Sequence, residues 1–511
     1  MKKSYVLPVM LLMAATGAYA QDAYKQVRPE KVIISPAQPL SVKEDSLRKL
    51  ILQWSEKQLS NKQPKQVLPH PAAAIFPGAV KPGAVAVTRT IALQHQPVSD
   101  TLQRILSRME YGSPLEDNLY STGLYAAPGA AITVQLPTGL LHKSIRVQIG
   151  CHTDNLGEWV AATENWRRMP RIVRKDELTN TKTTIASPFG GLVYICASPT
   201  GTAWQGDITI SGAVPAPLFE AGKTSLVEWQ EQLRQNKAPW GELATNNIIL
   251  TLPDSILQRV HQPDSILHLW NLIAGGEMEL AQLPQPAYRP QRLVIDEHLG
   301  GGYMHSGYPI MIHHAPSVGM VSADIIADPA KLLIPSAGGA NWGFFHEIGH
   351  NMQNLDWVFG GTTEVSCNFF SLYMFDRFLG SREGAHTGIS AHDTRQLMEK
   401  YFKAGANYDT WQNDPFLGLI LFRQLQEGFG WESFKTFFRK CQELAIRDPE
   451  GNYAKTDEQK RDLWAKTFST ITGRNLAPFF ETWGIPISTA VKQELAPLPG
   501  WMPYNFPLST R

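Results

Sequence analysis

Two periodicities of apolar side chains divide the chain. Between residues 41 and 61, and again between 99 and 111, apolar residues recur every three or four positions, which predicts two amphipathic helices. From about residue 118 to 213 apolar and polar residues alternate in short runs punctuated by Gly and Pro, as in Ile145, Val147 and Ile149. This alternation predicts antiparallel strands. We therefore expect a β-sandwich that follows an N-terminal helical and linker region.

The rest of the chain mixes both patterns. Strands are predicted at 248–252, 293–296 and 303–312, and the last of these is flanked by glycines. Helices are predicted at 225–234, 416–426, 431–444, 462–472 and 476–483. Short helical segments broken by Gly and Pro are expected over 254–284, and an irregular tail is expected after Pro486.

A length of 511 residues exceeds one hydrophobic core and predicts several domains. The expected division is a signal peptide over 1–20, a helical and linker region over 21–117, an accessory β-sandwich over 118–213 and a catalytic domain over 214–511. The catalytic domain should end in a mostly helical lobe. The predicted fold class is therefore multidomain α+β.

The charge balance and the first residues indicate where the protein acts. Charged residues make up 18% of the chain and the net charge is +1, which gives no electrostatic footprint for nucleic acid or an anionic membrane. Lys2 and Lys3 precede an apolar run over 6–15, and Ala18-Tyr19-Ala20 has the form of a cleavage site. The apolar run is too short for a transmembrane anchor. We expect export to a secreted, periplasmic or cell-surface location after cleavage near Ala20.

The chain has four cysteines and no C-x-x-C pair, so a structural zinc knot is not expected. Cys151 and Cys196 fall in the strand-rich region and are the one plausible disulfide, although two buried free thiols fit equally well. Cys367 lies in a very apolar predicted helix, where a small core residue is the simplest interpretation.

The clearest chemical motif is His346-Glu347-x-x-His350. At helical pitch the two imidazoles lie one turn apart on one face and can reach a single metal ion. Glu347 is rotated by about 100° from His346, close enough to act on a water molecule without binding the metal. The motif alone arises by chance in about one chain in fifty. The residues around it therefore have to show whether it is a metal site.

Two residues after the motif could supply a third ligand. Asp356 has the metzincin spacing, but Gln353 stands where that pattern needs a Gly. Glu364 begins an apolar helix after a Gly-Gly break, which is the gluzincin arrangement, and it is preferred over the alternative of a carboxylate that only stabilises the helix N-terminus. Asn368, one turn further, could accept a hydrogen bond from a ligand histidine. His346, His350 and Glu364 are therefore expected to bind one Zn²⁺ ion.

This ligand set predicts hydrolysis. Glu347 would take a proton from the water molecule that zinc activates, and the resulting hydroxide would attack a peptide carbonyl. A further hydrogen-bond donor should stabilise the negative oxygen that forms. Tyr303, His305, Tyr308 and Tyr408 are the candidates, and the sequence does not rank them.

Taken together, these stretches resemble a known family. Y-M-H-S-G-Y-P-I from Tyr303, N-W-G-F-F-H-E-I-G-H-N-M-Q from Asn341 and G-G-T-T-E-V-S-C-N from Gly360 look like the enhancin-like, mucin-degrading gluzincin peptidases. The resemblance covers roughly residues 118–490. It implies a thermolysin-like catalytic domain and secreted zinc endopeptidases that act on mucins and related O-glycoproteins, several of which require a glycan beside the cleaved bond.

Carried over by position, the resemblance makes His346, His350 and Glu364 ligands and Glu347 the general base. Its glycan-reading residues do not transfer. From aromatic and polar character alone, Tyr303, His305, Tyr308 and Trp342 are the candidate substrate contacts, and the strand over 303–312 could pair with an extended substrate or be an ordinary internal turn.

Two other functions stay open. The first is a gluzincin peptidase or aminopeptidase without a glycan requirement. The second is a carbohydrate-binding or adhesin protein with a structural zinc site, against which Glu347 argues, since a structural site has no use for a base. The sequence leaves open the preferred glycan, the cleavage side and whether the β-sandwich binds sugar.

Overall fold

The computed structural model describes residues 28–506 except 110, 160–163, 317–318, 335–339, 383, 449–453 and 505. The predicted signal peptide over 1–20 lies outside the described residues. Among the helices that are described, none combines the length and apolar character needed to cross a membrane. All four cysteines are buried free thiols, so Cys151 and Cys196 do not form a disulfide.

The strand-rich region forms one antiparallel sheet of eight strands in the order β5-β4-β7-β2-β8-β3-β6, with β1 paired to β8. Because β2 pairs with both β7 and β8, the sheet is continuous and curls around its own apolar core. The predicted alternation thus gives a near-closed sheet instead of two separate facing sheets. The strands are β1 (Val87–His95), β2 (Asn118–Ala126), β3 (Ala131–Gln135), β4 (Arg146–Ile149), β5 (Arg174–Glu177), β6 (Lys182–Ala186), β7 (Gly191–Ala197) and β8 (Trp204–Pro215).

The strand β1 comes from the stretch that was expected to be helical or linker. Its side chains alternate between half-buried and exposed, and it pairs with β8 along its length. A strand with one partner and one solvated face does not need strongly apolar residues at alternate positions. The hydrophobic pattern of the sequence therefore did not reveal this strand.

A second, mixed sheet of six strands follows in the order β13-β14-β12-β11-β10-β9. The single strand predicted over 303–312 is two short antiparallel strands, because the chain turns at Gly307, whose φ is 132°. β13 forms the edge of this sheet. The strands are β9 (Leu218–Glu220), β10 (Trp240–Ala244), β11 (Ile248–Pro253), β12 (Gln291–Asp296), β13 (Met304–His305) and β14 (Ile310–His313).

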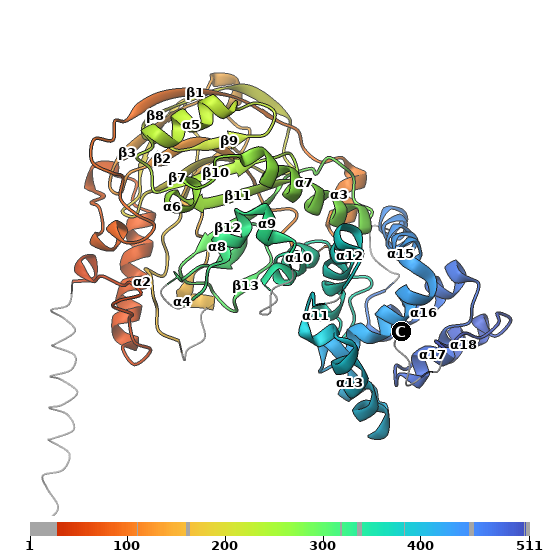
Figure 1. Ribbon diagram of the computed structural model, residues 1–511. Coiled ribbons are helices and arrows are strands. Elements are labelled where there is room, and N and C mark those ends of the chain that lie inside the picture. The colour runs from red at the N-terminus through yellow and green to blue at the C-terminus, as the bar shows by residue number, and fades with distance from the viewer. Residues whose placement is uncertain are drawn as a thin grey trace, which may run out of the picture.

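Figure 1 shows the eight-stranded sheet beside the mixed sheet, with α10 between the mixed sheet and the C-terminal helices. The helices up to the mixed sheet's last strand are α2 (Asp45–Leu59), α3 (Asp100–Leu106), α4 (Leu156–Trp159), α5 (Leu226–Gln235), α6 (Asp254–Leu257) and α7 (Pro263–Leu280). Those after it are α8 (Ser322–Ile326), α9 (Pro329–Leu332), α10 (Ala340–His350), α11 (Thr363–Ser366), α12 (Asn368–Leu379), α13 (Ala391–Lys403), α14 (Tyr408–Trp411), α15 (Pro415–Arg447), α16 (Asp457–Thr472), α17 (Ala477–Thr482) and α18 (Thr489–Leu495).

Three helical predictions need correction. The helix α7 runs unbroken through Gly276, where a Cβ would lie 2.9 Å from Met374 of α12, so this glycine serves close packing. The predicted helices 416–426 and 431–444 form the single element α15 with a kink at Gly430, whose φ is 74°. The tail expected after Pro486 contains α18, because Ser488 caps a new helix by accepting a hydrogen bond from the Val491 amide.

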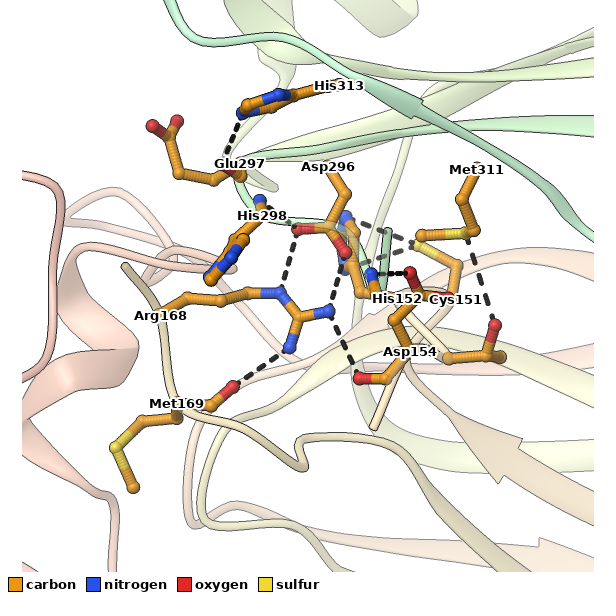
Figure 2. A network of polar contacts seen from close by, with 12 residues as sticks. Cys151, His152, Asp154, Arg168, Met169, Asp296, Glu297, His298, Met311 and His313 are labelled. Carbon is orange, nitrogen blue, oxygen red and sulfur yellow. Dashed lines mark hydrogen bonds and ion pairs between the residues drawn. The ribbon is translucent and has the colours of Figure 1, made fainter. Parts of the chain in front are cut away.

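A buried polar network joins the eight-stranded sheet region to the mixed sheet (Figure 2). The Arg168 guanidinium donates two 2.8 Å hydrogen bonds to the Asp296 carboxylate, and both side chains are 0% exposed. Arg168 also donates to the backbone carbonyls of Met169 and Asp154. His152 bonds the Ile295 carbonyl at 3.1 Å. The network fixes the position of Asp154 relative to the end of β12.

We expect Arg168→Met to destabilise the fold by about 3–5 kcal/mol, because it leaves the Asp296 charge buried without a partner. Urea unfolding measures the loss. The double variant that also carries Asp296→Leu should recover a large part of it. Arg171→Met is the matched control, since Arg171 makes an exposed 3.9 Å ion pair with Glu56 and should cost less than about 1 kcal/mol. Equal losses for Arg168→Met and Arg171→Met would contradict this view of the network.

Candidate active site

The helix α10 carries the H-E-x-x-H motif and packs directly against α12. Gly349 allows the contact, because a Cβ at this position would lie 2.5 Å from the Cys367 carbonyl oxygen. At the other end, Gly343 accommodates Met304 of β13, whose Cε lies 3.0 Å from the position of a Cβ. The glycines of α10 thus bring α12 and the edge strand close to the motif.

Three side chains converge with the spacing that zinc requires. His346 Nε2 lies 3.2 Å and His350 Nε2 3.5 Å from Glu364 Oε2, and the two Nε2 atoms are 3.1 Å apart. Ligands of a tetrahedral zinc ion at about 2.0–2.1 Å are themselves about 3.3 Å apart. The donor set and its spacing therefore fit one zinc ion, with a position left for water.

Hydrogen bonds behind the ligands set their orientation. His346 Nδ1 lies 2.7 Å from Asn368 Oδ1, and His350 Nδ1 lies 2.8 Å from Gln353 Oε1. An amide oxygen can only accept, so each Nδ1 carries the proton and each Nε2 keeps its lone pair for the metal. Asn368 thus lies where the sequence predicted a partner for a ligand histidine. Gln353, which rules out the metzincin turn, has a supporting role of its own.

Trp342, a candidate substrate contact, is buried at 3% exposure and donates a 2.7 Å hydrogen bond from Nε1 to Asn368 Oδ1. It therefore supports Asn368 and presents no face to a bound peptide.

The weaker candidate ligand Asp356 lies outside the cluster of metal-binding groups. Its carboxylate is buried and pairs with Arg108 at 2.5 Å. The Asp356 charge is already neutralised by Arg108, so this carboxylate is not available as a ligand. Glu364 is the carboxylate that lies with His346 and His350.

Cys367 joins the cluster, which the sequence did not predict: its thiol and the donors of His346, His350 and Glu364 all lie within 4.8 Å of one another. Its Sγ is 3.3 Å from His346 Nδ1 and 3.5 Å from Nε2. A zinc ligand would be nearer the metal-facing Nε2 than Nδ1, so the thiol packs against the ring. Its position one helical turn after Glu364 is the sequence signal that could have placed it near the cluster.

We expect Cys367→Ala to retain one zinc per chain and to keep kcat within about threefold of wild type, because three ligands suffice for a catalytic zinc site. Metal analysis and peptide cleavage check this result. Loss of zinc from the folded variant would show that the thiol is a ligand.

Glu347 is 7% exposed and lies next to the ligands without joining them. Burial raises the pKa of its carboxyl above the ordinary value, which makes it a better proton acceptor. His305 lies near enough for its charge to act on Glu347 in the opposite direction. This arrangement suits the general base that the motif predicts.

A second buried carboxyl lies close to the site. Glu277 of α7 is 0% exposed, and neither of its oxygens has a partner among the described residues. Burial raises the pKa of this carboxyl well above 4.5. It is therefore neutral in the fold at pH values where it ionises in the unfolded chain.

Because folding takes up a proton at Glu277, its contribution to stability falls as the pH rises above 4.5 towards the raised pKa of the folded state. We expect Glu277→Met to stabilise the protein more at pH 8 than at pH 5, by about 1.4 kcal/mol for each unit of the pKa shift. Thermal unfolding at both values checks this. The exposed Glu443 offers a control, Glu443→Met, that should respond equally at both. A gain for Glu277→Met that does not depend on pH would contradict the burial argument.

Two of the other candidate substrate residues line an open pocket of about 670 Å³. His305 and Tyr308 line it, whereas Tyr303 does not and bonds Ser322 at 2.5 Å instead. The walls come from three parts of the chain, namely the segment around Tyr111, the eight-stranded sheet and its loops with Gln148, Asp154 and Lys175, and residues 300–309. Tyr111, which the sequence analysis did not select, also contacts His350, with ring centroids 5.6 Å apart.

Family models match most of this structure. The model for peptidase M60, enhancin and enhancin-like, matches residues 212–484, and the model for the N-terminal domain of M60-like peptidases matches residues 105–211. Among curated proteins, TRPM8 channel-associated factor 2 of Homo sapiens is 38% identical over 383 residues, which cover 75% of this chain and 39% of that protein. The TRPM8 channel-associated factor homolog of Xenopus laevis is 37% identical over 75% of this chain and 40% of its own. The chain thus spans about two fifths of these relatives.

Solved structures share the fold. A functionally unknown conserved protein from Bacillus anthracis str. Ames superposes with a TM-score of 0.62 at 21% identity, covering 81% of this chain and 80% of that one. IMPa from Pseudomonas aeruginosa in complex with an O-glycopeptide superposes with a TM-score of 0.58 at 15% identity, covering 90% of this chain and 62% of that one.

Proposed function

Because the chain belongs to the peptidase M60, enhancin and enhancin-like, family, we propose that it is a zinc-dependent endopeptidase that cleaves O-glycosylated, mucin-type proteins. The observation that carries the proposal is the convergence of His346, His350 and Glu364 at tetrahedral spacing, with Glu347 beside them. A structural metal site has no use for such a base.

When bound, zinc would lower the pKa of a water molecule and polarise the peptide carbonyl. The chain's own groups do the rest. Glu347 accepts a proton from the attacking water and passes it to the leaving amine. Asn368 and Gln353 hold the two imidazoles in the metal-binding tautomer. The edge strand β13 offers its backbone to an extended substrate, next to the pocket lined by His305 and Tyr308.

Two findings support a glycosylated substrate. IMPa, whose fold this chain shares, has been solved with an O-glycopeptide bound. The pocket lined by Tyr111, which contacts His350, has space and polar side chains for more than an extended peptide, with Asp117, Gln148 and Lys175 on its walls. Export directed by residues 1–20 to a secreted, periplasmic or cell-surface location would bring the enzyme to mucins.

Digestion of one mucin-type glycoprotein before and after enzymatic removal of its O-glycans tests the proposal. We expect the zinc-loaded enzyme to cleave the glycosylated form, and a chelator to stop it until zinc is restored. Equal cleavage of both forms would remove the glycan requirement and leave a general gluzincin peptidase. Failure to cleave either form would overturn the proposal.

A second candidate function is non-catalytic association with another protein. The curated relatives at 37–38% identity are named for association with the TRPM8 channel. In that case the zinc site would stabilise the fold, and zinc removal would lower the melting temperature of a protein that has no peptidase activity. The digestion above separates the two functions.

A further inference from the structure

A hydrolytic site needs a donor for the oxygen that becomes negative when the carbonyl is attacked. Of the four candidates from the sequence, two tyrosines have their hydroxyls engaged away from the cluster. Tyr303 bonds Ser322 at 2.5 Å, and Tyr408 donates to the Gly360 carbonyl at 2.8 Å.

The other two candidates line the pocket, and their polar atoms bond groups outside the metal-ligand cluster. The Tyr308 hydroxyl accepts the Leu119 amide at 3.3 Å, and the Arg289 guanidinium lies over its ring at 3.7 Å. His305 uses both ring nitrogens, one on Asp154 at 2.9 Å and the other on the Ser306 carbonyl at 2.8 Å. Through the bond to Asp154, His305 fixes the edge strand β13 to the eight-stranded sheet region.

We propose that Tyr111 is the missing donor, a catalytic residue that the N-terminal region contributes to the site. The proposal rests on the proposed peptidase function. The Tyr111 ring lies 5.6 Å from that of His350, inclined by 44°. Its hydroxyl is 3.2 Å from Thr363 Oγ1, the residue before the ligand Glu364. Tyr111 therefore contacts one metal ligand and the residue that precedes another, and it also lines the pocket.

The segment that carries Tyr111 is fixed on both sides. Before it, Arg108 pairs with Asp356 at 2.5 Å and accepts the Leu355 amide on its carbonyl at 2.7 Å. After it, Arg289 donates to the carbonyls of Gly112 and Ser113, both at 2.7 Å. Such anchoring holds a donor in place before the reaction, which is what electrostatic stabilisation of a transition state requires. It also gives Asp356, the rejected third ligand, a function.

The hydrogen bonds allow this role. Thr363 can donate to the Tyr111 oxygen, which leaves the tyrosine proton free for the substrate. As the water oxygen bonds to the carbonyl carbon, the carbonyl π electrons move to oxygen, and Tyr111 donates a hydrogen bond to it without losing its proton. When the C–N bond breaks, the carbonyl re-forms and the amine leaves with the proton from Glu347.

The test compares hydroxyl deletions in the full-length, zinc-loaded enzyme on a defined O-glycopeptide. Tyr111→Phe should lower kcat by about 10²–10³-fold, with KM changed less than about threefold, because the hydroxyl acts mainly in the transition state. Zinc content and melting temperature should match wild type, since the ring still packs on His350. The matched controls Tyr303→Phe and Tyr408→Phe should keep kcat within about threefold.

Thr363→Val tests the positioning role of the threonine. It should lower kcat less than Tyr111→Phe, and the double variant should be no slower than Tyr111→Phe alone, because both changes disrupt one unit. Wild-type kcat in a folded, zinc-loaded Tyr111→Phe enzyme would overturn the assignment and leave the peptidase function standing. A wild-type enzyme that cleaves no O-glycopeptide would overturn both.

Discussion

Glu347→Gln should lower the kcat for peptide-bond cleavage by about 10²–10⁴-fold, the range that a positioned general base supplies. The amide keeps the shape of the carboxylate but does not accept the proton of the attacking water. Zinc content should stay at one per chain, because Glu347 lies beside the three ligands and is not one of them. Cleavage assays paired with metal analysis of the same preparation check both parts.

The exposed carboxylate Glu443 supplies the control for Glu347→Gln. Glu443→Gln makes the same chemical change far from the motif in sequence, on α15, and should leave kcat unchanged. A Glu347→Gln enzyme that retains zinc and wild-type turnover would contradict the assignment of the base.

Glu364→Gln should weaken zinc binding by more than the about 10–100-fold that loss of a supporting hydrogen bond costs, because it removes a charged ligand from the metal. Activity should fall with metal occupancy and return in part at high zinc. Competition with a chromophoric chelator measures the affinity.

Asp356→Asn is the discriminating control for Glu364→Gln. It should leave zinc affinity unchanged, because Asp356 pairs with Arg108 outside the cluster, and should instead lower kcat by loosening the segment of Tyr111. A large loss of zinc from Asp356→Asn with little loss from Glu364→Gln would exchange the two assignments.

The metal site could be predicted because its information is local. One helical turn separates His346 from His350 and Glu364 from Asn368, so the spacing alone places each pair on one face. The approach of α11 and α12 to α10 requires a chain break followed by an apolar helix. Gly360 and Gly361 indicate the break, and the apolar run after Glu364 indicates the helix.

Long-range contacts could not be predicted. Tyr111 and Thr363 are 252 positions apart, and nothing in the periodicity of either segment indicates that they meet. The strand β1 was missed for a related reason, since its one-sided burial depends on pairing with β8, more than a hundred residues further along the chain. For Cys367 the signal was local. Its position one helical turn after Glu364 places it on the same face as that ligand, but the apolar residues around it favoured the interpretation as a core residue.

The most direct test of the central claim is a mass-spectrometric map of the products from one defined O-glycopeptide incubated with the zinc-loaded enzyme. The arrangement of His346, Glu347, His350 and Glu364 predicts a single new amino terminus next to the glycosylated residue, which disappears with chelator and in Glu347→Gln. An intact peptide after incubation with the zinc-loaded wild-type enzyme, or the same new terminus produced at the wild-type rate by Glu347→Gln, would contradict it.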